Sequence, residues 1–431
     1  MSAPPTSAPK RTKTHDPWEP LRHKSFAAFF CAASISNAAS WMQLVAVSAV
    51  LFDLTHRSSW LGLQTVASLL PAVFLTPYAG VLADRVSRRL ILIVTQSVQM
   101  SVAFTMWWAY RSHYLTPWRI IGLSFVSGIT VGFQTSAWQS FVPLLVPDAQ
   151  LTKAVKLNSM QYTLARAIGP AMAGWAVHSS GPGTAIFANA ITYPMVIAVL
   201  IFANPRVVTK ASRDEHIFRA LIDGALFMAR QRSLRLALIL GTLMALCGQS
   251  LQYMAPAVAV KILHKTSNDN APLLIGLGIG AVVGSLVGTM YGDRVSRNAR
   301  TLTSLVMYII MAGTLALHPS FPVAIFVYGV GGAAHFTMAM VLNTLIHSGV
   351  PDHMRGRALS FYFLGILGGI PLGTQILGSL SDAFTVRTAL VIDVCVLAAL
   401  FIWLAETGKG KLLDAPILVA TDDREISHQT Q

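Results

Sequence analysis

Long apolar runs separated by short polar turns dominate this chain of 431 residues. A helix that crosses the hydrocarbon core of a bilayer needs roughly 20 apolar residues, and twelve runs have about this length or more. They cover residues 25–52, 60–83, 90–110, 118–142, 157–179, 183–203, 234–262, 272–291, 301–317, 321–346, 359–381 and 387–405. The pattern predicts an all-α polytopic membrane protein with twelve transmembrane helices.

The longest connection, residues 204–233, divides the runs into two sets of six. It is polar and basic, but its apolar residues recur at helical spacing, which predicts an amphipathic helix along the membrane surface. These residues are Ile217, Phe218, Leu221, Ile222, Ala225, Leu226 and Met228. We therefore expect one six-helix half over 25–203, a linker over 204–233 and a second half over 234–405. The polar ends, 1–24 and 406–431, are predicted to be disordered tails.

Two short sequences occur once in each half. The pentapeptide Asp-Arg-Val-Ser-Arg stands at residues 84–88 and again at 293–297, 209 positions later. The tripeptide Val-Pro-Asp stands at 146–148 and at 350–352, 204 positions later. Both copies of each lie between corresponding runs, which indicates that the halves are repeats of one architecture. Repeated halves with a solute path between them are common in secondary transporters.

The charges of the chain follow its predicted topology. Only 12% of the residues are charged, against about 25% in soluble proteins, and the net charge is +14. Of the 32 Lys and Arg residues, 25 lie in the two tails and the connections on their side, and six lie on the opposite side. The positive-inside rule therefore places both termini in the cytoplasm. The basic excess is explained by topology, so we expect no nucleic-acid partner.

The sequence shows no pattern for a bound metal ion, for ATP or for a catalytic cluster. Cys31, Cys247 and Cys395 all lie in apolar runs and are too scattered for a metal site, so they are interpreted as small buried hydrophobes. A Walker A sequence is absent, so the chain has no P-loop for ATP. The twelve His residues are dispersed, without the clustered His, Asp or Glu of a membrane-embedded enzyme. We expect no cofactor and no catalytic residue.

Residues 80–89 (Gly-Val-Leu-Ala-Asp-Arg-Val-Ser-Arg-Arg) resemble the loop signature of the major facilitator superfamily, with Ser87 in place of its second glycine. Residues 36–43, 141–147, 165–170 and 350–357 are similar to the branch that contains the bacterial enterobactin exporter. The resemblance implies the major facilitator fold in a bacterial inner membrane. It also implies export of a siderophore-like or drug-like solute.

The two pentapeptide turns carry the acidic and basic residues of a predicted conformational latch. These residues are Asp84, Arg85, Arg88, Arg89, Asp293, Arg294 and Arg297. The resemblance implies that each Asp holds the facing half on the cytoplasmic side, where a helix N-terminus favours an anion. The alternative is a basic turn that sets topology and carries a solvated Asp. That alternative does not explain why the Asp recurs at the same place in both halves.

Arg166 is a cation within a membrane span, where a charge costs about 2.5–3.5 kcal/mol on insertion scales. It therefore faces the bundle interior, either as a contact for a solute anion or as a partner of another buried group. Gly169 and Pro170 follow it and predict a bend, because proline removes a backbone hydrogen bond.

The resemblance implies that runs one, four, seven and ten line a central cavity. The remaining candidate pathway residues are Asn37, Trp41, Gln43, Gln134, Trp138, Gln249, Gln252, Tyr253, His335 and Asn343. Together with Arg166 they describe an amphipathic, mostly neutral pocket that suits a bulky aromatic or anionic solute. Each alone is better explained as a hydrogen bond within the bundle than as a solute contact. His335 is a candidate proton carrier or a neutral packed side chain, and Gly128 stands where many antiporters of the superfamily have an arginine.

We therefore expect a monomeric secondary exporter that moves a small organic solute across the membrane lipid by alternating access, coupled to protons. Import of an organic anion on the same fold stays open, because alternating access is reversible. A membrane-embedded enzyme, a channel and a non-transporting receptor are the alternatives from other classes. Saturable flux that collapses with an uncoupler distinguishes the transporter from all three.

Overall fold

The computed structural model describes residues 16–206 and 217–414, and each element in these ranges is helical. The first half contains η1 (Glu19–Arg22), α1 (Lys24–Thr55), α2 (Ser58–Arg85), α3 (Arg88–Arg111), α4 (Pro117–Phe141), η2 (Val142–Leu145), η3 (Asp148–Gln150), α5 (Leu151–Ser180) and α6 (Pro182–Phe202). The connecting segment contains α7 (Ile217–Arg230). The second half contains α8 (Arg232–Met244), the π-helical turn η4 (Ala245–Gln249), α9 (Ser250–Tyr253), α10 (Ala255–Lys261), η5 (Ser267–Asp269), α11 (Asn270–Tyr291), η6 (Gly292–Arg294), α12 (Arg297–Ala316), α13 (Phe321–Gly349), α14 (Asp352–Ala383), α15 (Val386–Thr407) and η7 (Lys409–Leu413).

Within the described ranges, eleven helical spans are long and apolar enough to cross a membrane. The remaining predicted run is α5, which is 30 residues long but carries polar side chains such as Lys153, Asn158 and Arg166. It lies between α1 of its own half and α11 of the other half, so protein surrounds much of its polar surface. The predicted all-α membrane fold is confirmed. Since η4 interrupts the seventh run, that span is built from α8, η4, α9 and α10.

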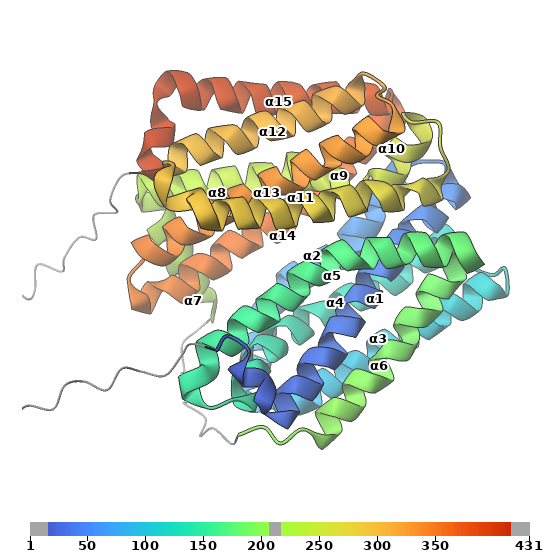
Figure 1. Ribbon diagram of the computed structural model, residues 1–431, viewed down its shortest axis with the longest axis vertical. Helices are drawn as coiled ribbons and strands as arrows, with labels where there is room; N and C mark the ends of the chain where they lie inside the picture. The colour runs from blue at the N-terminus through green and yellow to red at the C-terminus, as the bar shows by residue number, and fades with distance from the viewer. Residues whose placement is uncertain (1–15, 207–216, 415–431) are drawn as a thin grey trace, which may run out of the picture.

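The two halves form two helical bodies that meet along α2 with α14 and along α5 with α11 (Figure 1). The described chain ends, residues 16 and 414, lie at the same end of the molecule, which we call the tail end. The opposite end, which we call the closed end, carries the loops around residues 56–57, 262–266, 317–320 and 384–385. Figure 1 shows the two bodies close together at the closed end and diverging toward the tail end.

The backbone repeats between the halves at the closed end. The non-glycine residues with positive φ in the described part of the chain are all histidines: His56, His113, His264 and His318. Each follows a helix, where a left-handed residue commonly ends the helical turn, and histidine adopts this conformation more readily than most residues. His56 and His264 are 208 positions apart, and His113 and His318 are 205 apart. These spacings match the sequence repeat.

Glycine permits a very close helix crossing between α11 and α13. A Cβ atom on Gly280 would lie 1.8 Å from the carbonyl oxygen of Gly329, and one on Gly332 would lie 2.0 Å from that of Leu277. Side chains therefore cannot be accommodated at these positions without separating the helices. The corresponding crossing of α2 and α4 is also close, since a Cβ on Gly128 would lie 2.6 Å from the Ala67 carbonyl oxygen.

Residues assigned to both tails continue the ordered structure. At the start, η1 buries Pro20, and Glu19 forms an ion pair with Lys153 that lowers the pKa of the Glu19 carboxyl. At the end, η7 buries Leu413 completely, and the Asp414 carboxylate accepts hydrogen bonds from the first backbone amides of α12. Helical structure therefore extends beyond the expected tail boundaries at 24 and 406, toward residue 16 at the start and residue 414 at the end. These contacts join residues 134 and 117 positions apart, so no apolar run in the sequence marks them.

The predicted linker helix forms as α7 and packs against α14. Met228 on its packed side is fully buried, whereas Ile222 and Leu226 are exposed. The apolar stripe is thus divided between a protein contact and an exposed face. Contact of that face with the membrane surface stays a prediction.

Candidate functional site

Arg166 of α5 reaches from the first half to the second. Its Nη2 donates a hydrogen bond of 2.9 Å to Oε1 of Gln252 on α9, and Gln252 is buried. The two residues are 86 positions apart, so no local sequence pattern joins them. The arginine therefore has a neutral acceptor rather than a carboxylate, and its positive charge is not cancelled by this partner.

Two aromatic rings flank the guanidinium. Its Cζ lies 5.1 Å from the ring centre of Trp41 on α1 and 5.6 Å from that of Phe336 on α13. Both distances are within the range at which a ring face attracts a cation. One ring comes from each half, so the site joins a cation, an amide and aromatic surface across the interface between halves.

Two small cavities adjoin this site. A cavity of about 10 Å³, roughly the space of one water molecule, lies beside Arg166. Its polar and aromatic lining includes Gln249, Gln252, Tyr308, His335 and Phe336. A second cavity of about 120 Å³ lies between the halves and is lined in part by Gln64, Thr65, Gln252 and Tyr253. Both are smaller than the 300–1,000 Å³ typical of ligand pockets, so a bulky solute requires the halves to separate.

A π-helical turn shapes the wall of this site in the seventh span. The turn η4 carries Cys247, Gly248 and Gln249, and the Gln249 side-chain oxygen is buried without a hydrogen-bond partner. A Cβ atom on Gly248 would lie 2.3 Å from the Tyr308 ring, so glycine allows that ring to lie directly on the turn. π-turns within α-helices occur frequently at functional sites.

Two of the predicted pathway residues bond within the first half. Asn37 donates to Oε1 of Gln161 at 3.2 Å. Gln43 accepts a 2.8 Å hydrogen bond from Nδ2 of Asn189 on α6. Both contacts fasten neighbouring helices of one half, which is the bundle alternative that the sequence left open.

Three further candidates lie away from Arg166. Trp138 donates its Nε1 proton to Asn158 at 3.3 Å and packs in the core of the first half. Asn343 donates to the Ala339 carbonyl within its own helix at 2.9 Å. Gln134 is half-buried on α4. The structure thus gathers Trp41, Arg166, Gln249, Gln252, Tyr253 and His335 around the two small cavities.

Gly169 and Pro170 lie inside α5, which continues as one helix through them. A Cβ atom on Gly169 would lie 2.4 Å from the Trp41 Cβ and 2.7 Å from the Ala38 carbonyl oxygen. Gly169 therefore lets α5 approach α1 closely enough for Arg166 to contact the Trp41 ring. The predicted bend at Pro170 stays a prediction.

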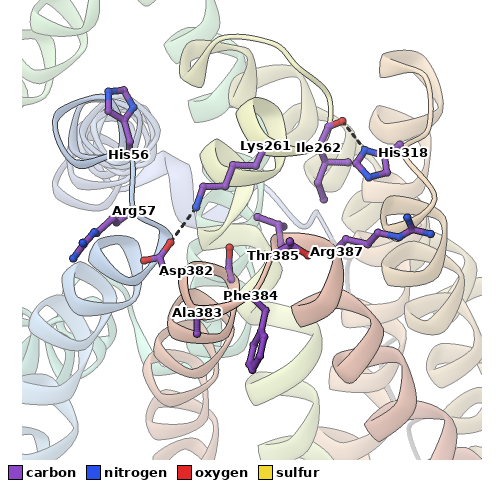
Figure 2. Close-up of a pocket in the computed structure, with 12 residues that line it drawn as sticks. His56, Arg57, Lys261, Ile262, His318, Asp382, Ala383, Phe384, Thr385 and Arg387 are labelled. Atoms are coloured by element: carbon purple, nitrogen blue, oxygen red, sulfur yellow. Dashed lines mark hydrogen bonds and ion pairs between the residues drawn. The ribbon is translucent and has the colours of Figure 1, made fainter.

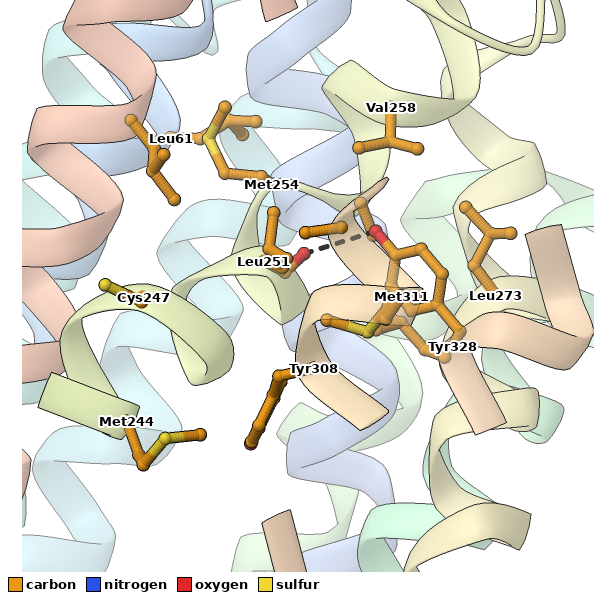
Figure 3. Close-up of a cluster of buried hydrophobic side chains, with 14 of the residues drawn as sticks. Leu61, Met244, Cys247, Leu251, Met254, Val258, Leu273, Tyr308, Met311 and Tyr328 are labelled. Carbon is orange, nitrogen blue, oxygen red and sulfur yellow. Dashed lines mark hydrogen bonds between the residues drawn. The ribbon is translucent and has the colours of Figure 1, made fainter. Parts of the chain in front are cut away.

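Phe336 and Tyr308 belong to the site but were not among the sequence candidates. Both are aromatic residues in apolar runs, where most such residues are core. Figure 3 shows Tyr308 within a buried hydrophobic cluster to which both halves contribute, in the same view as Met311 and Cys247. The helical periodicity of the sequence does not distinguish these two aromatic residues from residues of that core.

The latch prediction falls partly outside the described residues, because the side chains of Asp84, Arg85 and Asp293 are not described. Arg88 donates to the Ser140 carbonyl of its own half at 3.3 Å, and Arg89 is half-buried at the start of α3.

In the second copy, the Arg294 guanidinium lies 5.7 Å from the ring centre of Tyr291. Arg297 donates its backbone amide to Asp414 at 2.6 Å and its Nη1 to the Leu413 carbonyl at 3.2 Å. The described contacts of these arginines are thus made within one half.

A contact that the sequence analysis missed joins the halves at the closed end. The Asp382 carboxylate on α14 accepts hydrogen bonds of 2.8 Å from the backbone amides of Ser58 and Ser59 at the start of α2. Lys261 at the end of α10 donates to Asp382 at 3.0 Å and to the Ser58 hydroxyl at 3.1 Å. An anion is favoured at a helix N-terminus, so this set, which we call the closed-end clasp, stabilises contact between α2 and the second half.

A cavity of about 750 Å³ lies beside the clasp (Figure 2). Figure 2 shows Lys261 directed toward Asp382 and the His318 ring directed toward the Ile262 carbonyl, 3.2 Å from its Nδ1. Arg57 and Arg387 also line it, so the Lys and Arg side chains in its wall outnumber the single carboxylate, Asp382. This cavity is distinct from the two small cavities that Gln252 lines.

A polar site between two repeated six-helix halves defines a secondary transporter of the major facilitator type. Solved structures share this fold: the nucleoside transporter NupG has a TM-score of 0.73 at 14% identity, covering 89% of this chain and 99% of its own. A bacterial homologue of the human lysosomal transporter Spinster has a TM-score of 0.71 at 14% identity, covering 94% and 100%. The model of the family described as "Transmembrane secretion effector" matches residues 15–411. The chain belongs to this family, which is part of the major facilitator superfamily.

Curated relatives are bacterial transporters. Macrolide efflux protein A of Streptococcus pyogenes is 26% identical over 65% of this chain and 70% of its own. The staphyloferrin A transporter of Staphylococcus aureus is 24% identical over 89% and 96%. The multidrug efflux pump Tap of Mycobacterium bovis is 22% identical over 84% and 88%. The protein is therefore a multi-pass transporter of bacterial type and not an enzyme.

Proposed function

We propose that this protein exports a bulky amphipathic organic anion, siderophore-like or drug-like, by alternating access of its two halves. The observation that carries the proposal is Arg166, a cation between halves whose hydrogen-bond partner Gln252 is neutral. A solute carboxylate can replace that amide and gain a charge-assisted hydrogen bond. The Trp41 and Phe336 rings beside it supply apolar surface for the rest of the solute.

The relatives favour efflux as the direction. Two of them are named as efflux proteins and a third as a siderophore transporter, at identities of 22–26%. A carboxylate-bearing siderophore combines the negative charge and the size that the site favours. Import of an organic anion is the opposite outcome of the same assay.

We assign the tail end to the cytoplasm, because most Lys and Arg residues lie in its segments. On this assignment the described conformation is closed to the outside by the clasp between Ser58, Lys261 and Asp382. Solute enters from the tail end, and closing of that end around Asp84 and Asp293 accompanies opening of the clasp. Protons driving this exchange would enter as solute leaves.

Inside-out membrane vesicles containing the protein test the proposal. We expect saturable uptake of labelled staphyloferrin A that collapses when an uncoupler dissipates the proton gradient. Erythromycin, an amine-bearing macrolide, is the second probe and should be taken up less if Arg166 selects anions. Uptake into right-side-out vesicles under an inward proton gradient, without uptake into inside-out vesicles under an outward proton gradient, would instead establish import.

The matched variants are Arg166→Ala and Arg166→Lys. The alanine variant should lose staphyloferrin A uptake, while the lysine variant, which keeps the charge without the planar donor pair, should keep part of it. Uptake by Arg166→Ala equal to wild type for both probes would exclude Arg166 as the solute contact. Equal membrane amounts of all three proteins are required for the comparison.

A further inference from the structure

At one sequence offset, a polar contact of the first half aligns with another in the second half. Helix α6 begins at Pro182 and α15 at Val386, 204 positions later. At this offset Asn189 of α6 corresponds to Asp393 of α15, and Gln43 of α1 corresponds to Cys247 of η4. The pair Asn189–Gln43 therefore occupies the place in its half that Asp393–Cys247 occupies in the other.

In the first half this place is a satisfied amide network. Asn189 is buried, and its Nδ2 donates to Oε1 of Gln43 at 2.8 Å and to the Tyr193 hydroxyl at 3.2 Å. Its Oδ1 accepts from the Ser40 hydroxyl at 3.3 Å. Both polar ends of the amide have partners, as buried polar groups generally require.

In the second half the same place is nearly apolar. The residues that correspond to Ser40 and Tyr193 are Met244 and Leu397. Asp393 is 3% exposed, and its Oδ2 has no hydrogen-bond partner. It is the one acidic or basic residue among those described that is fully buried.

The titratable groups around Asp393 offer no compensating cation. The Cys247 thiol of η4 donates a hydrogen bond to the carboxylate, and Tyr308 of α12 is the neighbouring phenol. On α14, Tyr362 lies instead against Gly241. On α10, Lys261 is paired with Asp382 at the closed end.

A buried carboxylate without a cation is costly, so such a group is stable as the neutral acid. It ionises when water or a new partner reaches it. Tyr308 connects the carboxyl with the solute site, because its ring lies on Gly248 of η4 and also lines the small cavity beside Arg166. Separation of the halves at Arg166 therefore changes the packing of η4 and the surroundings of Asp393.

We propose that Asp393 is the proton-binding carboxyl through which this transporter is coupled to the proton gradient. The carboxyl takes up one proton while the closed end is open and keeps it in the buried state described here. It releases the proton to water admitted from the tail end when solute occupies the site near Arg166. This proposal rests on the transport function proposed above and adds the residue that carries the proton.

Infrared spectroscopy of the purified protein in lipid tests proton binding without any solute. The wild-type protein should show the C=O stretch of a protonated carboxylic acid at neutral pH, and the band should disappear as the pH is raised. Asp393→Asn should lack the band. Glu406→Gln, which alters an exposed carboxyl on the same helix, should keep it. A wild-type protein without the band, or a band that persists in Asp393→Asn, would overturn the proposal whether or not solute transport is found.

Transport provides the second arm, with labelled staphyloferrin A in inside-out vesicles. Asp393→Asn should lose accumulation driven by a pH gradient but keep exchange of labelled for unlabelled solute without a gradient. Gradient-driven accumulation by Asp393→Asn at the wild-type level would refute Asp393 as the carrier. Absence of both activities in the wild type would instead refute the proposed solute and leave the infrared result decisive for Asp393.

If Asp393→Asn does not fold, the double variant Asp393→Asn with Cys247→Gln replaces it. That variant rebuilds the Asn–Gln pair that the first half already contains at the corresponding place. The same two outcomes then apply to it.

Discussion

Asn189 and Asp393 hold the same place in the two halves, yet the first has partners at both polar ends and the second has an unpartnered oxygen. The contrast extends beyond this pair. In the second half Gln249, Asn270 and Gln375 also have a buried side-chain oxygen without a partner, whereas Gln96 is the example described in the first half. Unpartnered buried polar groups cost about 1–3 kcal/mol each. We infer that the first half is the fixed frame and that the second half repacks during transport.

The strongest test of this contrast is at the close crossing of α11 and α13 in the second half. Gly280→Val should abolish stable folding, because its Cβ would lie 1.8 Å from the Gly329 carbonyl oxygen and α11 would separate from α13. Gly132→Ala at the corresponding crossing of the first half should cost about 1–3 kcal/mol, since its Cβ would lie 3.1 Å from Ala72. The yield of monodisperse protein and the thermal midpoint measure both effects.

Gly122→Ala is the control for these variants, because nothing lies within 4 Å of a Cβ atom at that position. It should leave the thermal midpoint unchanged. Similar losses of thermal midpoint for Gly280→Val and Gly122→Ala would show that steric contact at the crossing is not the cause of the destabilisation.

Giving each half the polar residue of the other, Asp at position 189 or Asn at position 393, should change the stability by unequal amounts. Asn189→Asp removes the donor to Gln43 and Tyr193 and should cost about 1–3 kcal/mol. Asp393→Asn loses no hydrogen-bonded ion pair and should leave the thermal midpoint at or above that of the wild type. Thermal unfolding in one detergent, followed at constant pH, compares the two. Equal destabilisation by both exchanges would contradict the assignment of a fixed first half.

The two contacts at the closed end should also differ. Asp382→Asn removes the ion pair with Lys261 and weakens the cap on α2. The population that is open at this end should therefore rise several-fold, which corresponds to a free-energy change of about 1 kcal/mol. Asp53→Asn alters the single hydrogen bond with Ser267 and should have a smaller effect. Distances between spin labels at the closed end of α2 and α14 report the population. An unchanged distance distribution in Asp382→Asn would remove the clasp from the mechanism.

The smallest predicted difference lies within the repeated pentapeptide. Ser296 caps α12 through the amide of Ala299, whereas Ser87 makes no side-chain cap to α3. Ser296→Ala should therefore cost about 1 kcal/mol, and Ser87→Ala should be close to neutral. Thermal midpoints of the two variants measure this difference. The opposite order would show that the pentapeptide caps α3 rather than α12.

The sequence alone predicted the spans and their division into halves, because the length and hydropathy of a run are local properties. Even the short run at 301–317 corresponds to a helix, α12. The family resemblance in residues 80–89 was likewise local, and the match over residues 15–411 confirms the superfamily. Arg166 could be predicted to face the interior, since a lipid-facing charge is costly.

Partners were decided by the tertiary structure. Arg166 bonds Gln252, 86 positions away, and Asp382 bonds Ser58, 324 positions away. No periodicity links such residues, since their proximity arises from how two bodies dock. For the same reason Gln43 and Trp138, which are as polar as the residues around Arg166, are packed within one half.

The sequence thus determined that this protein is a two-half membrane transporter. Each apolar run can be buried in lipid, and each basic loop can be kept on one side, independently of the other runs. Only the tertiary structure decided which end is closed and that one carboxylate oxygen of Asp393 is buried without a hydrogen-bond partner. Alternating states share one sequence and one set of helices, and they differ only in contacts between distant surfaces. Those contacts have no counterpart in local pattern.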